Sequence, residues 1–233
     1  MKTKYFTLIS TLIVMGLIIL SCKEDWLDAK PDQSLVVPSK LTDYRALLDN
    51  TNVFGRYSPG MGDGATDQSY VTDQIFLSFD NMSRNIYIWA DGDISDGHVS
   101  SDWYVAYREI MNANVVLDGL EKLPIEEMQL KEKNTLRGEA LFHRARVFYE
   151  LAQVFCNPYD PSTANTDLGL PLKNTPDVNE NPQRSSLEDT YRKILSELGE
   201  AYSLLPESSM YKTRPNKHAV TALLARIYLS IED

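Results

Sequence analysis

The chain has 233 residues, of which 43% are hydrophobic and 10% aromatic, and its formal net charge is −10 at pH 7. This apolar and aromatic content is enough to bury a core and excludes a fully disordered chain. The acidic balance argues against nucleic acid as a partner, because phosphates need a basic surface, and against electrostatic binding to a membrane.

The N-terminus begins with a short charged segment followed by an apolar run. Lys2 and Lys4 precede residues 5–20, an apolar stretch shorter than the roughly 20 residues that a membrane-spanning helix needs. The run ends in Ile19-Leu20-Ser21-Cys22, which resembles a bacterial lipobox, the motif whose cysteine is lipidated and becomes the N-terminus after cleavage. The alternative is an ordinary secretory signal peptide with a chance cysteine.

The residues after this cysteine indicate a destination. Lys23-Glu24-Asp25 resembles the lysine-plus-two-acids signal that sends lipoproteins of the Bacteroidetes to the outer face of the outer membrane. We therefore expect residues 1–21 to be a lipoprotein signal peptide, Cys22 to carry acyl chains, and residues 22–40 to form a polar tether. Several acyl chains anchor a protein stably, whereas one alone is marginal.

Apolar residues at steps of three and four predict helices through most of the remaining chain. The first helix is expected over residues 41–48. The later ones are expected over residues 101–123, over residues 126 or 130 to 155, over residues 185 or 186 to 205, and over residues 216–231. At the start of the fourth, Ser185-x-x-Glu188 is interpreted as a capping box.

Two stretches between these helices have the composition of loops. Residues 51–100 are rich in Gly, Asp and Ser, but their aromatic side chains favour an ordered loop region with short strands around residues 74–79 and 85–89. Residues 157–184 are proline-rich. We expect Cys156 at the end of a helix, half-buried and without a disulfide partner.

Two of the expected helices share a short motif. Ala145-Arg146-Val147-Phe148 recurs as Ala225-Arg226-Ile227-Tyr228, and each motif lies in a helix that follows an aromatic-rich one. This pattern is typical of helix-turn-helix repeats of the tetratricopeptide type. The alternative is a bundle of unrelated amphipathic helices. Either way the sequence predicts a mainly all-α fold with long ordered loops and at most minor β structure.

Taken together, these stretches resemble the SusD/RagB family of Bacteroidetes outer-membrane lipoproteins. Each motif is weak alone, but their order and spacing span nearly the whole chain after the leader. The stretches that carry the resemblance are residues 22–31, Trp103-x-x-x-Tyr107-x-x-Ile110 with Asn114-Val115-Val116-Leu117, Arg137-Gly138-Glu139-Ala140 with Arg144-Ala145, Gly169-Leu170-Pro171-Leu172, Tyr191 to Leu205, and residues 217–229.

The resemblance implies a function in nutrient capture. Members of the family are surface-exposed lipoproteins that bind glycans, or less often peptides, and deliver them to a TonB-dependent SusC-like transporter, without breaking bonds and without a cofactor. A helical-repeat interaction scaffold that binds no small ligand is the alternative, and a surface enzyme such as a glycosidase is a third hypothesis.

One departure from the family pattern concerns length. Family members are considerably longer, so we expect residues 41–233 to be the N-terminal helical domain of a longer protein, with a final helix that exposes an apolar face.

The residue types that carry catalysis or bind metals are scattered. His98, His143 and His218 are far apart in the sequence, without a neighbouring carboxylate at metal-ligand spacing, and the two helical ones are expected near a surface. Asp91 to Gly97 looks superficially like a calcium loop but lacks the glutamate of an EF-hand, so a solvated acidic turn is preferred. We therefore expect no metal site.

Aromatic rings and hydrogen-bonding side chains in residues 51–100 are the candidates for glycan binding. Rings can stack on the apolar faces of sugars, while amides and carboxylates bond to hydroxyl groups. The alternative for Trp89 is a plug between the loop and the helices. The candidate ligand residues are Tyr57, Tyr70 and Trp89 as platforms and Asp67, with Gln68 and Asn81, as polar partners, whereas Trp103 and Tyr107 are expected in the core.

Overall fold

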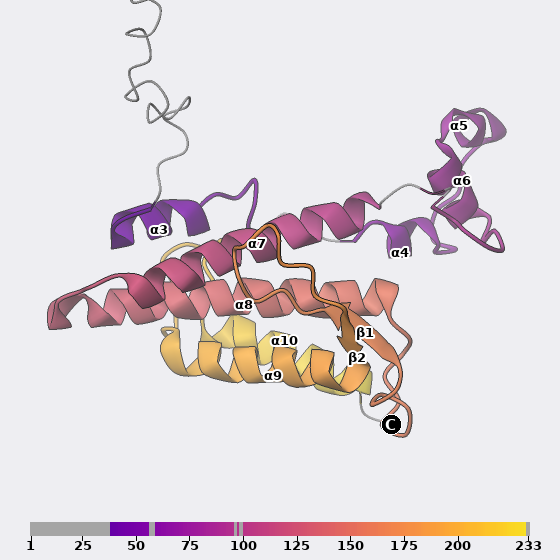
Figure 1. Cartoon of the computed structure of the whole chain (residues 1–233). Coiled ribbons are helices and arrows are strands. Elements are labelled where there is room, and N and C mark those ends of the chain that lie inside the picture. Colours follow the sequence, from indigo (N-terminus) through magenta and orange to yellow (C-terminus); the bar gives the residue numbers. More distant parts are fainter. Residues whose placement is uncertain (1–37, 56–58, 96, 98–99, 232–233) are drawn as a thin grey trace, which may run out of the picture. The chain divides into compact units, whose positions relative to one another are not determined.

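Within the residues that the computed structural model describes (38–55, 59–95, 97 and 100–231), the chain is helical with a small two-stranded sheet (Figure 1). The elements, labelled as in Figure 1, are α3 Leu41–Leu48, α4 Met61–Gly64, α5 Asp73–Ser78, α6 Asn81–Tyr87, α7 Ser101–Lys122, the 3-10 helix η1 Glu127–Gln129, α8 Leu130–Phe155, β1 Leu168–Pro171, β2 Arg184–Ser186, α9 Leu187–Leu204 and α10 Lys217–Ile231.

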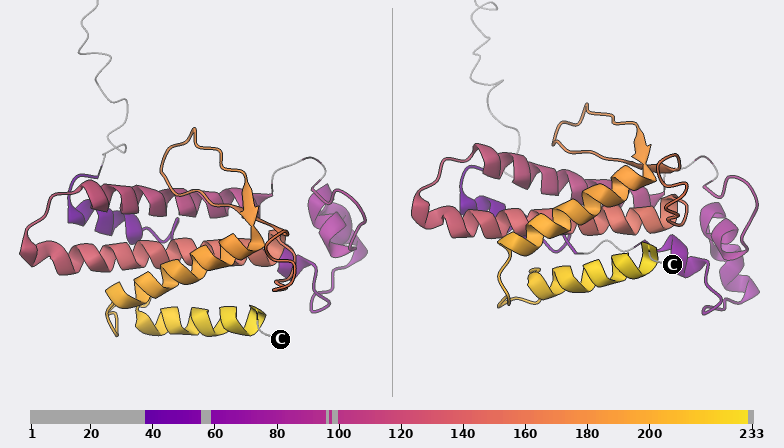
Figure 2. Two further views of the ribbon diagram at one scale, coloured as in Figure 1. Left: turned by 60° about the horizontal axis from the view of Figure 1, so that its bottom comes forward. Right: turned by 90° about the horizontal axis from the view of Figure 1, so that it is seen from below.

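The long helices form two antiparallel pairs. Helix α7 runs back along α8, and α9 runs back along α10, with α8 between α7 and α9 (Figures 1 and 2). Leu136 and Phe148 of α8 are completely buried, as are Ile110 of α7 and Ile194 of α9. The predicted all-α, tetratricopeptide-like scaffold is therefore confirmed, as is each of its five expected helices to within a residue or two.

The two copies of the repeated motif lie in the second helix of each pair. Ala145 and Phe148 of α8 are completely buried, because α9 covers that face. Their counterparts on α10, Ala225 and Tyr228, are exposed, and so is Leu229. Within the described residues, the apolar face of the last helix therefore lacks a covering element, as the sequence predicts.

The region of residues 51–100 differs from the prediction. The segments expected as strands at 74–79 and 85–89 are helical, in α5 and α6. Local capping explains the difference: the Ile75 N–H donates to Thr72 Oγ1 at 3.4 Å, and the Ser83 N–H donates to the Asp80 carboxylate at 2.8 Å. These bonds satisfy amides that a helix start leaves without partners, so the helical conformation is stabilised.

The start of α9 also corrects a prediction. Its N-cap is Ser186, whose Oγ accepts from the Asp189 N–H at 3.0 Å and donates to the Asp189 carboxylate at 2.8 Å. The expected Ser185–Glu188 capping box is wrong by one residue. Ser185 belongs to β2, which pairs with β1 in antiparallel fashion.

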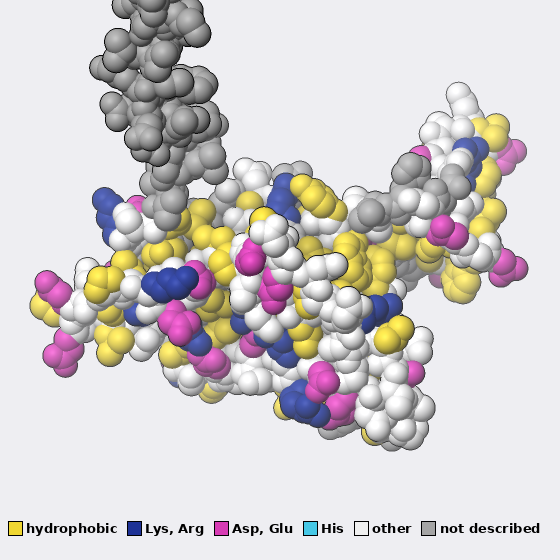
Figure 3. Space-filling view, viewed as in Figure 1, with side chains coloured by type: hydrophobic (Ala, Val, Ile, Leu, Met, Phe, Trp, Pro, Cys, Tyr) yellow, Lys and Arg dark blue, Asp and Glu magenta, His cyan; other side chains and the backbone are white. Residues whose placement is uncertain are grey.

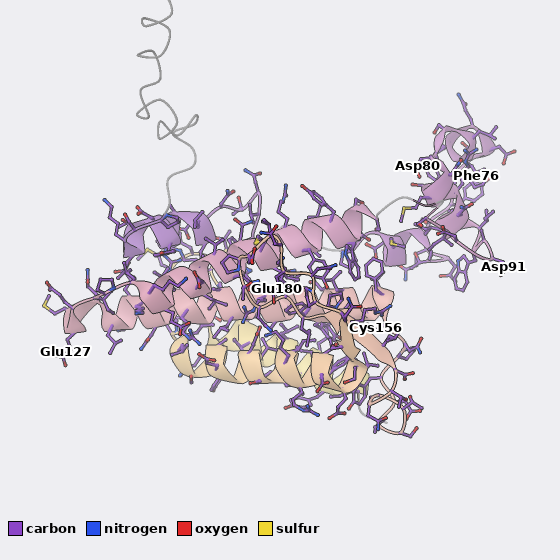
Figure 4. All side chains as sticks on the ribbon, in the orientation of Figure 1. Phe76, Asp80, Asp91, Glu127, Cys156 and Glu180 are labelled. Carbon is purple, nitrogen blue, oxygen red and sulfur yellow. The ribbon has the colours of Figure 1, made fainter. Side chains whose placement is uncertain are left out.

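The two strands close the long loop that follows α8. The guanidinium group of Arg184 donates to the carbonyl oxygens of Gly169 at 2.6 Å, Leu168 at 3.1 Å and Phe155 at 2.9 Å. Cys156 follows α8 beside the strands and is half-buried, as expected, and burial raises the pKa of its thiol (Figure 4). The loop between the strands carries Glu180, whose carboxylate accepts a hydrogen bond from the Thr175 hydroxyl.

A buried polar network fixes that loop against the helices. The Asn114 side-chain amide donates to the carbonyl oxygens of Lys173 at 3.1 Å and Thr175 at 3.0 Å, and its Oδ1 accepts from Arg144 at 2.5 Å. Arg144 also binds the Glu197 carboxylate with two N–H groups, at 3.1 and 2.7 Å. All three network side chains are buried, so their hydrogen bonds are little weakened by solvent.

Residues 1–21 and Cys22 lie outside the described residues. Among the helices that are described, none combines the length and the apolar character required to cross a bilayer.

Candidate functional site

Helices α4, α5 and α6 form a segment, residues 59–90, that we call the arm. Phe76 and Tyr87 pack against each other inside it, with ring centroids 5.8 Å apart, and the Tyr87 hydroxyl accepts from the Val71 N–H at 3.3 Å. Hydrophobic side chains gather on its surface (Figure 3). Leu77 and Ile88 are among the exposed ones, so the arm presents apolar surface to solvent.

Trp89 ends this segment in an unusual conformation. Its φ of 53° lies in the left-handed region, which costs a residue with a side chain roughly 1–2 kcal/mol. Hydrogen bonds to the end of α6 hold it there: the Trp89 and Ala90 N–H groups donate to the carbonyl oxygens of Ile86 at 3.2 Å and Asn85 at 2.9 Å. Strained residues of this kind often mark binding sites, because the surrounding structure has to maintain them.

The indole ring of Trp89 is fixed and open to solvent at the same time. Its Nε1–H donates to the Ala65 carbonyl oxygen at 2.8 Å, yet the residue is 75% exposed. The interpretation of Trp89 as a plug is therefore not what the structure shows. A large flat ring held in one orientation loses little entropy when a ligand stacks on it.

A cavity of about 440 Å³ lies beside this ring. Its walls come from α4 with Met61, from the end of α6 with Asn85 and Ile86, and from the end of α8 with Gln153. This volume is within the range of small-molecule sites, roughly 300–1,000 Å³. Met61 also lines two adjoining cavities of about 360 and 470 Å³, so the space continues around the arm.

The cavity is mostly apolar and uncharged, with two amide side chains in its wall. Its described lining includes no Asp, Glu, Lys, Arg or His. Gln153 donates through Nε2 to the Tyr191 hydroxyl at 2.8 Å, and Asn85 donates through Nδ2 to the Ile94 carbonyl oxygen at 3.4 Å. Both amide oxygens therefore stay available as acceptors. An indole platform with amide acceptors suits a neutral ligand that carries hydroxyl groups and apolar C–H faces.

The structure places the other predicted ligand residues apart from this cavity. Asp67 and Tyr70 are exposed on the arm, Tyr70 by 84%, but neither lines the cavity. Gln68 is exposed beside them, and Asn81 accepts from Arg84 at 2.7 Å on the surface of α6. Tyr57 lies outside the described residues. Of the predicted set, Trp89 is the one whose position beside a cavity can be described.

Sequence reasoning missed several lining residues. A strand is expected from the sequence at Asn85 and Ile86, although Asp80 as an N-cap and the Met82–Ile86 spacing both favour a helix. Gln153 lies within a correctly predicted helix, but nothing in its local sequence indicates that it reaches the arm.

In the acidic turn around residues 91–97, the carboxylate of Asp93 accepts hydrogen bonds from the turn itself. Asp93 accepts from the Ser95 hydroxyl at 2.5 Å and from the Ser95 and Gly97 N–H groups at 2.9 and 3.1 Å. These hydrogen bonds from Ser95 and Gly97 lower the pKa of Asp93. The part of the chain described here contains no group of three or more His, Cys, Asp and Glu residues placed to hold a metal ion.

His143 differs from the prediction, because it is only 5% exposed. It lies against Phe54, which follows α3, with ring centroids 5.0 Å apart, and beside the buried Glu109 of α7. His218, by contrast, is exposed on α10, as expected. Trp103 and Tyr107 pack against the core, as predicted, and the Tyr107 hydroxyl donates to the Pro171 carbonyl oxygen at 2.9 Å.

Solved structures with a similar helical architecture are known. The SusD superfamily protein of Bacteroides thetaiotaomicron has a similar structure, with a TM-score of 0.67 at 22% identity over 82% of this chain and 43% of the other. A SusD superfamily protein of Bacteroides vulgatus gives a TM-score of 0.61 at 25% identity, over 83% and 44%. These likenesses show a shared helical fold.

Sequence comparison points the same way. SusD-like protein P2 of Formosa agariphila is 26% identical over 140 residues, which are 59% of this chain and 25% of that protein. The chain thus spans about a quarter of the curated relative and less than half of the two solved structures. A SusD-like family model, described as starch-binding and associating with the outer membrane, matches residues 25–229. Because this match covers most of the 233 residues, the chain belongs to the SusD-like family of outer-membrane-associated, starch-binding proteins.

Proposed function

We propose that this chain binds a neutral oligosaccharide at the cavity beside Trp89. The observation that carries the proposal is the exposed indole ring, which is held by its own hydrogen bond at the rim of an uncharged cavity. The ring can stack on the C–H face of a sugar residue, and the oxygens of Asn85 and Gln153 can accept from hydroxyl groups. Tyr70 and Asp67, exposed on the same arm, and Tyr57 are candidates for contacts with further sugar residues.

The uncharged lining favours a sugar over a peptide as the ligand. A peptide also carries backbone donors and acceptors, but its charged termini and side chains gain nothing from a wall without charged groups. The same lining supports binding without catalysis. Glycoside hydrolysis needs a pair of carboxyl groups, and none lines this cavity among the described residues.

We further propose that the protein delivers its ligand to a TonB-dependent, SusC-like transporter from the outer face of the outer membrane. The lipobox-like segment with Cys22, the acidic signal after it and the association of the family with the outer membrane support this location. Lipid on Cys22 would provide the anchor, and no cofactor is needed for capture and release.

A helical-repeat scaffold without a small ligand is the second candidate. The exposed Tyr228 and Leu229 on α10 favour it, because repeat proteins use such faces to hold other helices. The two functions predict different effects of losing the indole ring. A scaffold would keep its protein partner and show no glycan affinity to lose, whereas a glycan-binding protein would lose its ligand and keep the transporter.

The experiment is calorimetric titration with maltoheptaose, an α-glucan chosen because the family is described as starch-binding. We expect Trp89→Ala to weaken binding about tenfold or more, which is the usual effect of removing a central aromatic contact. Trp89→Asn is the second variant, because Asn tolerates the left-handed backbone and removes only the ring. The matched control is Tyr202→Ala, an exposed aromatic on α9 away from the cavity. Unchanged affinity for maltoheptaose in both Trp89 variants, or no affinity of the wild type for any neutral oligosaccharide, would refute the proposal.

A further inference from the structure

A second cavity, of about 620 Å³, lies on the helical scaffold, and none of its lining residues belongs to the arm. Its walls come from the segment after α3, with Thr51 and Phe54, from α8, with Phe142 and His143, and from the segment before α10. It shares no lining residue with the cavity beside Trp89. The volume is again that of a small-molecule site.

The charges at this cavity have one sign. Arg146, Lys212 and Arg214 line it, and no Asp or Glu does so among the described residues, although the chain as a whole carries a net charge of −10. A wall of hydrogen-bond donors without carboxylates is therefore not the average surface of this protein. It suits a ligand rich in acceptors.

Carboxylates behind the wall hold the two arginines in place. Arg146 donates to Glu109 and Glu150, at 2.7 Å each. Arg214 donates through Nε and a terminal nitrogen to Asp49, at 2.8 and 2.7 Å. These three carboxylates orient the two guanidinium groups and offset their charge. The cation that remains for a ligand is the ammonium group of Lys212, which makes no ion pair within the described chain.

The inner wall contains one buried nitrogen without a hydrogen-bond partner, and an unpaired carboxylate oxygen lies behind it, outside the lining. His143 is 5% exposed, and its Nδ1 makes no hydrogen bond within the described residues. Glu109, 1% exposed, lies next to it, and its Oε2 is also unpaired, while its Oε1 is 3.5 Å from His143 Nδ1. Buried polar groups are nearly always satisfied, so the His143 nitrogen is a group that a ligand in this cavity could bond to.

The first turn of α10 adds a further positive element. Asn216 and Ala219 line the cavity, and Asn216 caps the helix by accepting from the Ala219 N–H at 3.0 Å. The N-terminal end of this 15-residue helix therefore faces the cavity, and helix N-termini carry partial positive charge.

We propose that this cavity is a separate site for a small carboxylate ligand. The carboxylate would contact Lys212 and the start of α10, with His143 and the fixed arginines as further donors. The same chemistry can come from two sources, a uronic acid or an acidic residue of a peptide. The proposal does not rest on the function proposed for Trp89, because the residues and the charge of the two sites differ.

The test is calorimetric titration of the full chain with glucuronate, glucose and the dipeptide Glu-Glu. Glucuronate and glucose differ in one carboxylate, so glucuronate should bind and glucose should not. Binding of Glu-Glu without glucuronate would support the carboxylate site with a peptide source. Equal binding of glucuronate and glucose, or no binding of either carboxylate at millimolar concentration, would overturn the proposal.

Three variants then locate the site. Lys212→Ala should lower the affinity about tenfold, the usual effect of losing a charge-assisted contact. Lys131→Ala, the same change at an exposed position of α8 outside this cavity, should leave the affinity unchanged.

His143→Leu separates binding from folding. It removes an unpaired buried nitrogen, so it should lower the affinity about tenfold without lowering the melting temperature. Wild-type affinity in both Lys212→Ala and His143→Leu would contradict the assignment.

Discussion

Arg144→Met is expected to destabilise the fold by removing the centre of the buried polar network. Arg144 is 7% exposed and makes three hydrogen bonds, two to Glu197 at 3.1 and 2.7 Å and one to Asn114 at 2.5 Å. Methionine fills a similar volume, so the change removes charge and hydrogen bonds more than packing.

The size of the effect follows from what remains. Removing one partner of a buried ion pair costs about 3–5 kcal/mol, because the other charge is left uncompensated. Here Lys193 still contacts the Glu197 carboxylate at 2.6 Å, so we expect the low end of this range, about 3 kcal/mol. For a chain of this size that corresponds to a fall in melting temperature of roughly 6–12 °C.

The assay is urea unfolding followed by circular dichroism at the helical band, in a double-mutant cycle with Glu197→Leu. The double variant should recover part of the lost free energy of unfolding, because an apolar pair replaces a broken ionic one. Hydrogen exchange should also quicken in residues 172–183, since Asn114 loses the contact that orients it toward Lys173 and Thr175. A cost below about 1 kcal/mol for Arg144→Met, or strict additivity in the cycle, would refute the reasoning.

Two further predictions concern helix packing and capping. Gly119→Ala on α7 would place a Cβ against the ring of the buried Tyr44, so we expect it to lower the free energy of unfolding in urea by about 1–3 kcal/mol. Gly199→Ala, which has open space around it, should raise the free energy of unfolding by about 0.5–1 kcal/mol. Equal effects of the two changes would contradict this account. The hydrogen bonds from the Ser83 N–H and hydroxyl lower the pKa of Asp80, which caps α6 (Figure 4). The stability that this cap contributes is therefore fully present above the ordinary carboxyl pKa of about 4, and it is lost as the pH falls through the lower pKa that Asp80 has in the folded protein. The Ser83 amide resonance should titrate in that range in the wild type and stay fixed in Asp80→Asn; movement in both would exclude Asp80 as the cause.

The long helices could be predicted because each buries one face over many turns. Leu136, Ala140, Phe148 and Leu151 of α8 are completely buried, and their spacing alone indicates the helix. The helices of the arm have four, six and seven residues, which is too short for an apolar period to be recognised. The N-cap residues of α5 and α6 are the features of the sequence that indicate these short helices, because an N-cap satisfies backbone amides whatever the length of the helix.

The candidate sites were harder to predict than the scaffold, since they depend on contacts between distant segments. Trp89 was identified as a platform, but its exposure follows from the left-handed turn after α6 and from the Ala65 carbonyl. Gln153 reaches the arm from the far end of α8. His143 is buried because Phe54, which comes almost 90 positions earlier in the chain, covers it. No local pattern contains these contacts.

The most direct test of the glycan site is the indole N–H resonance of Trp89 in a two-dimensional NMR titration with maltoheptaose. The chain has three tryptophans, and the spectrum of Trp89→Phe would assign the signal. The account predicts a saturable shift of the Trp89 resonance, because the ligand stacks on this ring. Saturable glucan binding that leaves the Trp89 resonance unmoved would contradict it.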